Sequence, residues 1–245
     1  ASSERHPLSF QQESELFSRH NEVIIIQGIP AAGIENTERF LMERLASETF
    51  LVKILHDCND LGSFRKELDQ LSDRKEDTIV MLVIPTGSPW CESWVEEACR
   101  RLQRFTSKIS FGKVLFLADP NSVWLLPDRF AEEFPIRRMT LRPWQETFVI
   151  QWLADNNMPH DVPARSIIDE HTGFWPAMLQ MLFQKYQARH DVTVSVKAFW
   201  QHIQNSKFRS ELMRQFGLED ADRQRALALI AEVGEIHKLD IPDYA

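Results

Sequence analysis

The sequence predicts an α/β fold, in which a parallel sheet with helices on both faces is followed by a wholly helical part. Short, continuous apolar runs recur through the first 141 residues, and such runs are typical of strands buried on both faces of a parallel sheet. Stretches with helical periodicity separate these runs, as in successive β-α-β units. After Pro143 only helical periodicity remains. The three observations together define the fold class.

Five strands are predicted. The first covers 22–27, with Val23-Ile24-Ile25-Ile26 at its centre, and Gly28-Ile29-Pro30 ends it. The others are expected at 50–55, 78–84, 113–118 and, more weakly, 136–141.

Helices are predicted between these strands at 35–47, 61–71 and 92–107. Beyond Pro143, residues 159–163 separate two helices, and residues 191–194 precede a last helical segment at 197–240. We therefore expect three units: an α/β domain at 1–142, a helical lid at 143–192 and a C-terminal helical segment at 193–245. Within the last unit, 220–236 carries apolar residues at helical spacing, which predicts the start of a helical or winged-helix module.

Composition excludes several classes of protein. Hydrophobic residues form 43% of the 245 residues, and 16 Phe and 7 Trp are among them, so the chain can bury a core and is not disordered as a whole. No apolar run approaches the roughly 18 residues that span a bilayer, and the first residues lack the pattern of a secretory signal. We expect a cytoplasmic protein without a membrane partner.

Charge and cysteine usage exclude further classes. The three cysteines, Cys58, Cys91 and Cys99, lack the paired spacing of a disulfide framework or a zinc site. The 36 acidic and 28 basic residues give a net charge of −8, which should repel a phosphate backbone. Nucleic acid is therefore not the expected partner, although a local basic surface could still bind it.

The turn after the first strand has the spacing of a phosphate-binding loop but lacks its chemistry. Gly28 and Gly33 fit the pattern G-x-x-x-x-G, whose glycines let backbone N–H groups surround phosphates. The next two positions should be Lys and Ser or Thr, but they are Ile34 and Glu35. Nothing here would neutralise the terminal phosphates or bind magnesium, and a carboxylate would repel them.

Three further segments resemble a known family. Residues 9–16 place an aromatic before a Glu-Leu helix, residues 140–146 contain Leu141-Arg142-Pro143, and residues 171–179 contain Thr172-Gly173-Phe174-Trp175-Pro176. In this order and spacing, the layout of roughly residues 5–240 resembles the AAA+ and STAND class of P-loop ATPase domains, particularly bacterial STAND-like modules. The resemblance implies a P-loop NTPase-like sheet and a lid whose proline, here Pro176, lies over the nucleotide.

The resemblance also shows what this chain lacks. The family's acidic motif should end the third strand, but Val80-Met81-Leu82-Val83-Ile84 leads into Pro85 and Thr86. Asp119 stands where the family's sensor residue would be, and it can equally cap a turn. We expect no catalytic residues and no metal, and a degenerate nucleotide pocket formed by Gly28, Gly33, Ile34, Glu35 and Pro176, with at most weak ATP binding.

The expected function is that of a pseudo-ATPase: a regulatory, assembly or protein-interaction module of a larger cytoplasmic protein. By analogy with relatives, this protein would be bacterial and would act in defence or signalling. Its partners would be other proteins or further domains of the same polypeptide. The alternatives are an ATP-binding switch or an ATPase completed by a partner subunit, and a DNA-binding module.

Other groups of residues have both a structural and a functional interpretation. A basic band of Arg100, Arg101, Arg104, Lys108 and Lys113 could meet phosphates or form a solvated face. Arg137-Arg138 precede the lid, and a structural role is favoured. His56 and Cys58 lack further metal ligands nearby. Most of the seven Trp should be buried, and any exposed one would mark a protein contact.

Overall fold

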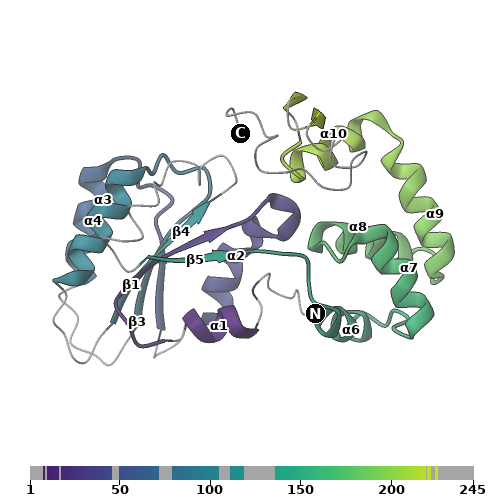
Figure 1. Cartoon of the computed structure of the whole chain (residues 1–245), viewed down its shortest axis with the longest axis horizontal. Helices are drawn as coiled ribbons and strands as arrows, with labels where there is room; N and C mark the ends of the chain where they lie inside the picture. The colour runs from purple at the N-terminus through teal and green to yellow at the C-terminus, as the bar shows by residue number, and fades with distance from the viewer. Residues whose placement is uncertain are drawn as a thin grey trace.

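The computed structural model describes residues 8, 10–16, 18–45, 50–71, 79–104, 111–118, 136–218, 220–221 and 224–225. Figure 1 shows a sheet flanked by helices and, beside it, a group of helices that follows it in the chain. This is the expected succession of an α/β layer and a helical part.

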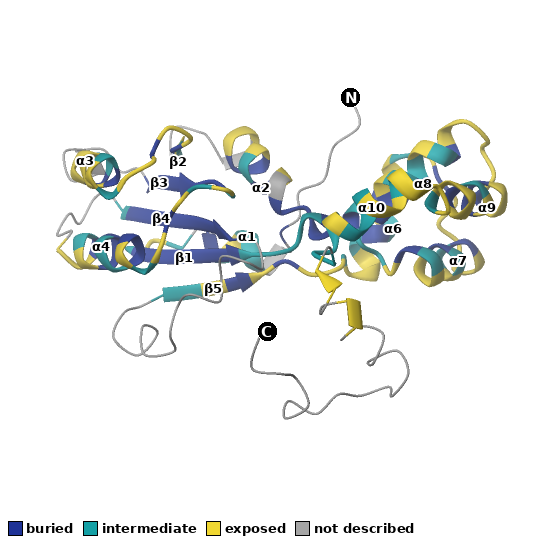
Figure 2. Ribbon diagram, turned by 90° about the horizontal axis from the view of Figure 1, so that it is seen from above, coloured by how far each residue is buried: buried dark blue, intermediate teal, exposed yellow. Residues whose placement is uncertain are grey.

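The sheet is parallel throughout the described strands, in the order β2-β3-β4-β1-β5 (Figure 2). The central strand β1 therefore lies between β4 and β5, and Ile24 is opposite Leu115 on one side and Arg137 on the other. In Figure 2 the strands point toward the helical part of the chain. The strands are β1 (Glu22–Gln27), β2 (Phe50–Ile54), β3 (Ile79–Ile84), β4 (Phe111–Ala118) and β5 (Ile136–Thr140).

Helices cover both faces of the sheet. Successive residues of a strand point to opposite faces, so neighbouring residues of β1 pack against different helices. Val23 and Ile25 of β1 pack in one cluster with α3 (Leu61–Leu71) and α4 (Glu92–Gln103). Ile24 and Ile26 pack in a second cluster with α1 (Phe10–Leu16), α2 (Ile34–Phe40) and the π-turn η2 (Leu41–Leu45). The helix expected at 35–47 is thus α2 followed by η2.

The helical part has its own apolar core. It contains α6 (Glu146–Asp155), α7 (Val162–Thr172), α8 (Pro176–Gln187), α9 (Val192–Ile203) and α10 (Ser206–Gln215). Their core includes Leu153, Ile168, Leu182 and Phe199, all buried.

Two predicted boundaries in the helical part need correction. The break expected at 191–194 is the start of α9, because Asp191 accepts a hydrogen bond from the Val194 N–H at 2.8 Å and caps the helix. The segment expected to be continuous from 197 is interrupted at Asn205, whose side chain accepts from the Lys207 N–H at 3.1 Å and caps α10. Residues 226–245 lie outside the described part, so the expected winged-helix start and the three-unit division stay predictions.

Candidate functional site

The turn after β1 is a short 3-10 helix, η1 (Pro30–Ala32), which leads through Gly33 into α2. Gly33 has φ 87° and ψ 25°, a left-handed conformation that glycine adopts without steric cost. Its N–H donates to the Pro30 carbonyl at 2.8 Å, and its own carbonyl accepts from the Asn36 N–H at 3.0 Å. The backbone of this turn therefore requires glycine at position 33, whether or not a ligand binds.

Gly28 is required by a neighbouring side chain. A Cβ at this position would lie 2.8 Å from the Leu141 Cβ, closer than real Cβ contacts come. Leu141 is fixed there because its N–H donates to the Gln27 carbonyl at 2.8 Å, directly after β5. The space that a Gly28 side chain would need is thus occupied by the segment that leads into the helical part.

Three backbone donors of the turn are used within the protein. The N–H groups of Gly28 and Ala32 donate to the carbonyls of Ala118 at 3.1 Å and Ile29 at 2.9 Å, and Gly33 donates to Pro30. Pro30 has no N–H group. A phosphate-binding loop needs such donors directed at the anion, and these four positions offer none.

The side chains of the turn are apolar, and those of Ala31, Ala32 and Ile34 are buried. Ala31 and Ala32 are inaccessible, and Ile34, which stands where the motif requires lysine, is 1% exposed. Ile34 belongs to the cluster that covers the second face of the sheet. Glu35 lies in the first turn of α2, and its side chain lies outside the described part.

Two helices of the helical part contact this turn directly, as α8 and α10 both lie against η1. Trp175, the residue before α8, packs against the cluster that contains Ala32 and Ile34. The ring of Phe216, just after α10, meets the Trp175 ring edge to face at 5.4 Å. The structure therefore brings α8, which begins at the buried Pro176, onto the turn that contains Gly28, Gly33 and Ile34.

Trp175 and Phe216 were not among the predicted site residues. Their indication in the sequence is weak, because an aromatic residue next to a helix start is common in any helical core. Only the folded chain shows that they lie over a turn more than 140 residues away.

A polar cleft of about 450 Å³ lies beside α2, at the carboxyl ends of β2 and β3. Burial raises the pKa of the Glu38 carboxyl, and the nearby His56 offsets part of this rise. No carboxylate follows β3 in the described residues 85–90, as the sequence indicates, and Asp119 lies outside the described part. The cleft is lined by Glu38, His56, Asn59, Pro85, Thr86, Gly87 and Ser88.

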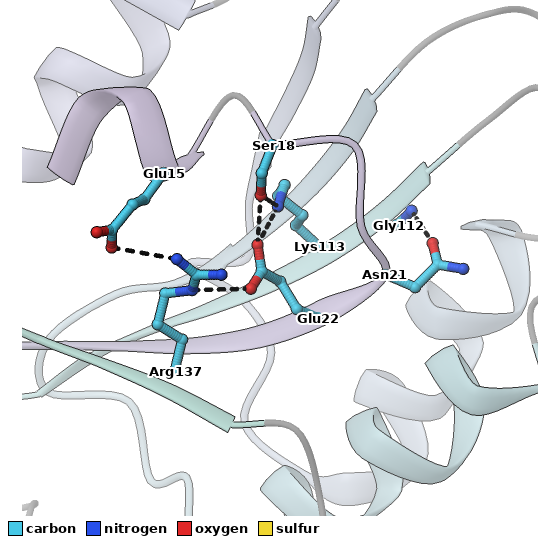
Figure 3. A network of polar contacts seen from close by, with 7 residues as sticks. All are labelled: Glu15, Ser18, Asn21, Glu22, Gly112, Lys113 and Arg137. Carbon is cyan, nitrogen blue, oxygen red and sulfur yellow. Dashed lines mark hydrogen bonds and ion pairs between the residues drawn. The ribbon is translucent and has the colours of Figure 1, made fainter. Parts of the chain in front are cut away.

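The opposite, amino end of the sheet contains a buried ion-pair network (Figure 3). Lys113 of β4, with no exposed side-chain surface, pairs with Glu22 of β1, and Arg137 of β5 donates to the other Glu22 oxygen at 3.0 Å. Arg137 also pairs with Glu15 of α1 at 3.2 Å. Burial alone would raise the pKa of Glu22, but hydrogen bonds from Lys113 and Ser18 and the two positive charges lower it overall.

This network removes one residue from the predicted basic band. Lys113 is buried in the sheet, so it cannot belong to an exposed face. Arg100 and Arg101 of α4 pair with Glu96 and Asp69, while Lys108 lies outside the described part. Basic side chains that are paired in this way attract a phosphate backbone only weakly. Arg137 has the structural role that the sequence favoured.

The remaining predicted groups have varied surroundings. Of the Trp residues, Trp90, Trp94 and Trp152 are buried, whereas Trp200 is 41% exposed and Trp124 lies outside the described part. Within the described part, no three His, Cys, Asp or Glu side chains gather to hold a metal ion. No described helix has both the length and the apolar character needed to cross a bilayer.

Comparison with solved structures identifies the fold. The chain is similar to the ORC2 protein of Aeropyrum pernix, solved as ADPNP-ADP complexes, with a TM-score of 0.50 and 13% identity over 93% of this chain and 76% of that one. The chain is also similar to RuvB of Thermotoga maritima, with a TM-score of 0.47 and 14% identity over 87% of this chain and 69% of that one. For the Walker-type ATPase paby2304 of Pyrococcus abyssi, the TM-score is 0.45 and the identity 13%, over 89% of this chain and 75% of that one.

No protein family matches the sequence, and no curated protein matches it either. At 13% identity the structural likeness concerns the fold alone. The chain thus has a P-loop NTPase-like α/β fold followed by a helical part, as the sequence predicted.

Proposed function

We propose that the chain is a pseudo-ATPase: a P-loop NTPase-like domain that neither grips nor hydrolyses ATP and that acts through its surface as a regulatory or assembly module. The single observation that carries this proposal is the state of the turn after β1. Its donors at Gly28, Ala32 and Gly33 are bonded within the protein, and Trp175 packs against the cluster to which its residues belong.

Physical chemistry connects that observation to the lack of catalysis. Phosphoryl transfer is catalysed almost entirely by positioning and by neutralising charge. At this turn the position of the expected lysine is the buried Ile34, and β3 leads into Pro85 and Thr86 without a carboxylate. A domain without these catalytic groups can still act by binding other proteins through its outer surface. As parts of the same proposal, the larger protein is bacterial and cytoplasmic and belongs to a defence or signalling system.

Thermal melting with and without MgATP tests the proposal. A ligand at 100 times its Kd stabilises a protein by about 2.7 kcal/mol, which for a chain of this size would raise Tm by roughly 5–10 °C. We expect no shift at millimolar MgATP. A shift of that size would contradict the proposal.

One observation favours an ATPase completed by a partner subunit as the second candidate. Glu38 of α2 contributes a carboxyl of raised pKa to the polar cleft, which Thr86 also lines. Phosphate release from the complete, assembled protein decides between the two candidates. Activity that Glu38→Gln or Glu35→Ala removes would establish the ATPase, and no release above background would support the pseudo-ATPase.

A further inference from the structure

A groove of about 500 Å³ runs between α7 and α9, on the helical part of the chain. Its floor is apolar, formed mainly by Ile167, Val196 and Trp200. Trp200 is 41% exposed, and Val194 on the same helix is 48% exposed. The complete lining is Ile167, His171, Thr193, Val196, Lys197, Trp200, Gln201 and Gln204.

Trp200 is held in place although it is exposed. Its indole N–H donates to Nδ1 of His171 at 2.9 Å, so the polar edge of the ring has a partner within the protein. The buried Phe199 meets the same ring edge to face at 5.7 Å. A large aromatic surface that is fixed before binding loses little side-chain entropy on association, which is typical of an interface anchor.

The charge of the groove differs from that of the whole chain. The chain carries a net charge of −8, yet the lining contains Lys197 and no carboxylate. Among the described residues Lys197 has no ion-pair partner, whereas Lys53 and Arg101 pair with Glu67 and Asp69. An occupant of this groove therefore meets an apolar floor with an uncompensated positive charge at its edge.

We infer that the groove binds an amphipathic helix of a partner protein, with apolar residues on one face and acidic residues flanking them. The lining extends along α9 from Thr193 to Gln204, about 16 Å at the rise of an α-helix, which matches about three turns of a bound helix. Apolar residues at i, i+3 or i+4 and i+7 would contact Trp200 and Val196. A Glu or Asp beside them would pair with Lys197. This inference rests on the proposed function, in which the surface does the work, and names the surface and the class of partner.

Selection from a displayed library of helical peptides tests the inference. The library varies the apolar face and offers either Glu or Lys at the flanking positions. We expect the selected peptides to carry acidic flanks. Their affinity should fall at least about tenfold with Trp200→Ala, as for an interface anchor, and several-fold with Lys197→Glu. Val162→Ala and Lys207→Glu are the matched controls, because both positions are exposed and lie outside the groove.

Several results would overturn the inference. These are the absence of selected peptides, a preference for basic flanks, or binding that Trp200→Ala leaves unchanged while circular dichroism shows the variant folded. Self-association that Trp200→Ala abolishes, measured by sedimentation, would identify a second copy as the occupant and would also overturn it. Nucleotide binding at the turn would refute the proposed function alone, because no step of the peptide assay involves the turn.

Discussion

Replacing Ile34 by lysine restores the missing residue of the phosphate-binding motif and should destabilise the chain. Ile34 is 1% exposed, and removing a buried isoleucine loses about 1.5–3 kcal/mol. A lysine kept neutral at pH 7 against its usual pKa of about 10.4 costs roughly 4.6 kcal/mol at 1.36 kcal/mol per unit. Because a long side chain can partly reach solvent, we expect a net loss of about 3–6 kcal/mol.

Urea unfolding at pH 7, followed by circular dichroism, measures this loss. The same change should lower Tm by roughly 6–24 °C in a chain of this size. Met42→Lys is the matched control, because Met42 is close in sequence but 44% exposed, and it should change the free energy of unfolding by less than about 1 kcal/mol. The reasoning would be refuted if Ile34→Lys were as stable as the parent chain and, combined with Glu35→Thr, bound MgATP. The turn would then be an intact phosphate site that lacks only its charged side chains.

Three further predictions concern stability. Lys113→Met leaves the Glu22 carboxylate buried without its partner and should cost about 3–5 kcal/mol, and a double variant with Glu22→Gln should recover part of this in urea unfolding. Because the pKa of Glu22 is lowered in the folded chain, its contribution to stability is complete above the unfolded pKa near 4.5 and is lost as pH falls through the folded pKa. Below about pH 4.5, the free energy of unfolding should therefore depend less steeply on pH in Glu22→Gln. An unchanged slope would contradict the assignment. Gly28→Ala sets a Cβ 2.8 Å from that of Leu141 and should cost about 1–3 kcal/mol, whereas Gly62→Ala meets only the Asp60 carboxylate at 3.0 Å and should be near neutral, because the gain in helix propensity within α3 offsets the tight contact.

The sheet could be predicted from the sequence because its strands are buried on both faces. A run such as Val23-Ile24-Ile25-Ile26 is typical of a strand that is buried on both faces of a parallel sheet. The predicted strand positions therefore agree with β1, β3 and β4 to within two residues. Lys113 was misread for the same reason: a lysine next to such a run looks like an exposed end, and its partner Glu22 lies 91 residues away.

The state of the candidate site depends on long-range packing. The sequence shows that lysine is missing after Gly33, but it does not show that Leu141 occupies the space beside Gly28 or that Trp175 packs on the cluster around the turn. The helix boundaries near Asp191 and Asn205 were missed because each side chain caps the helix that follows it. Asp and Asn are also common in loops, so the residue type alone does not distinguish the two environments.

The most direct measurement is a nuclear magnetic resonance titration of the uniformly ¹⁵N-labelled chain with MgATP. The amide resonances of Gly28, Ala32 and Gly33 report on three donors of the turn, and all three donate to protein carbonyls in the structure. We expect these resonances not to move at millimolar MgATP. A saturable shift of the three amides, accompanied by a shift of the Trp175 indole as α8 moves off the turn, would contradict it.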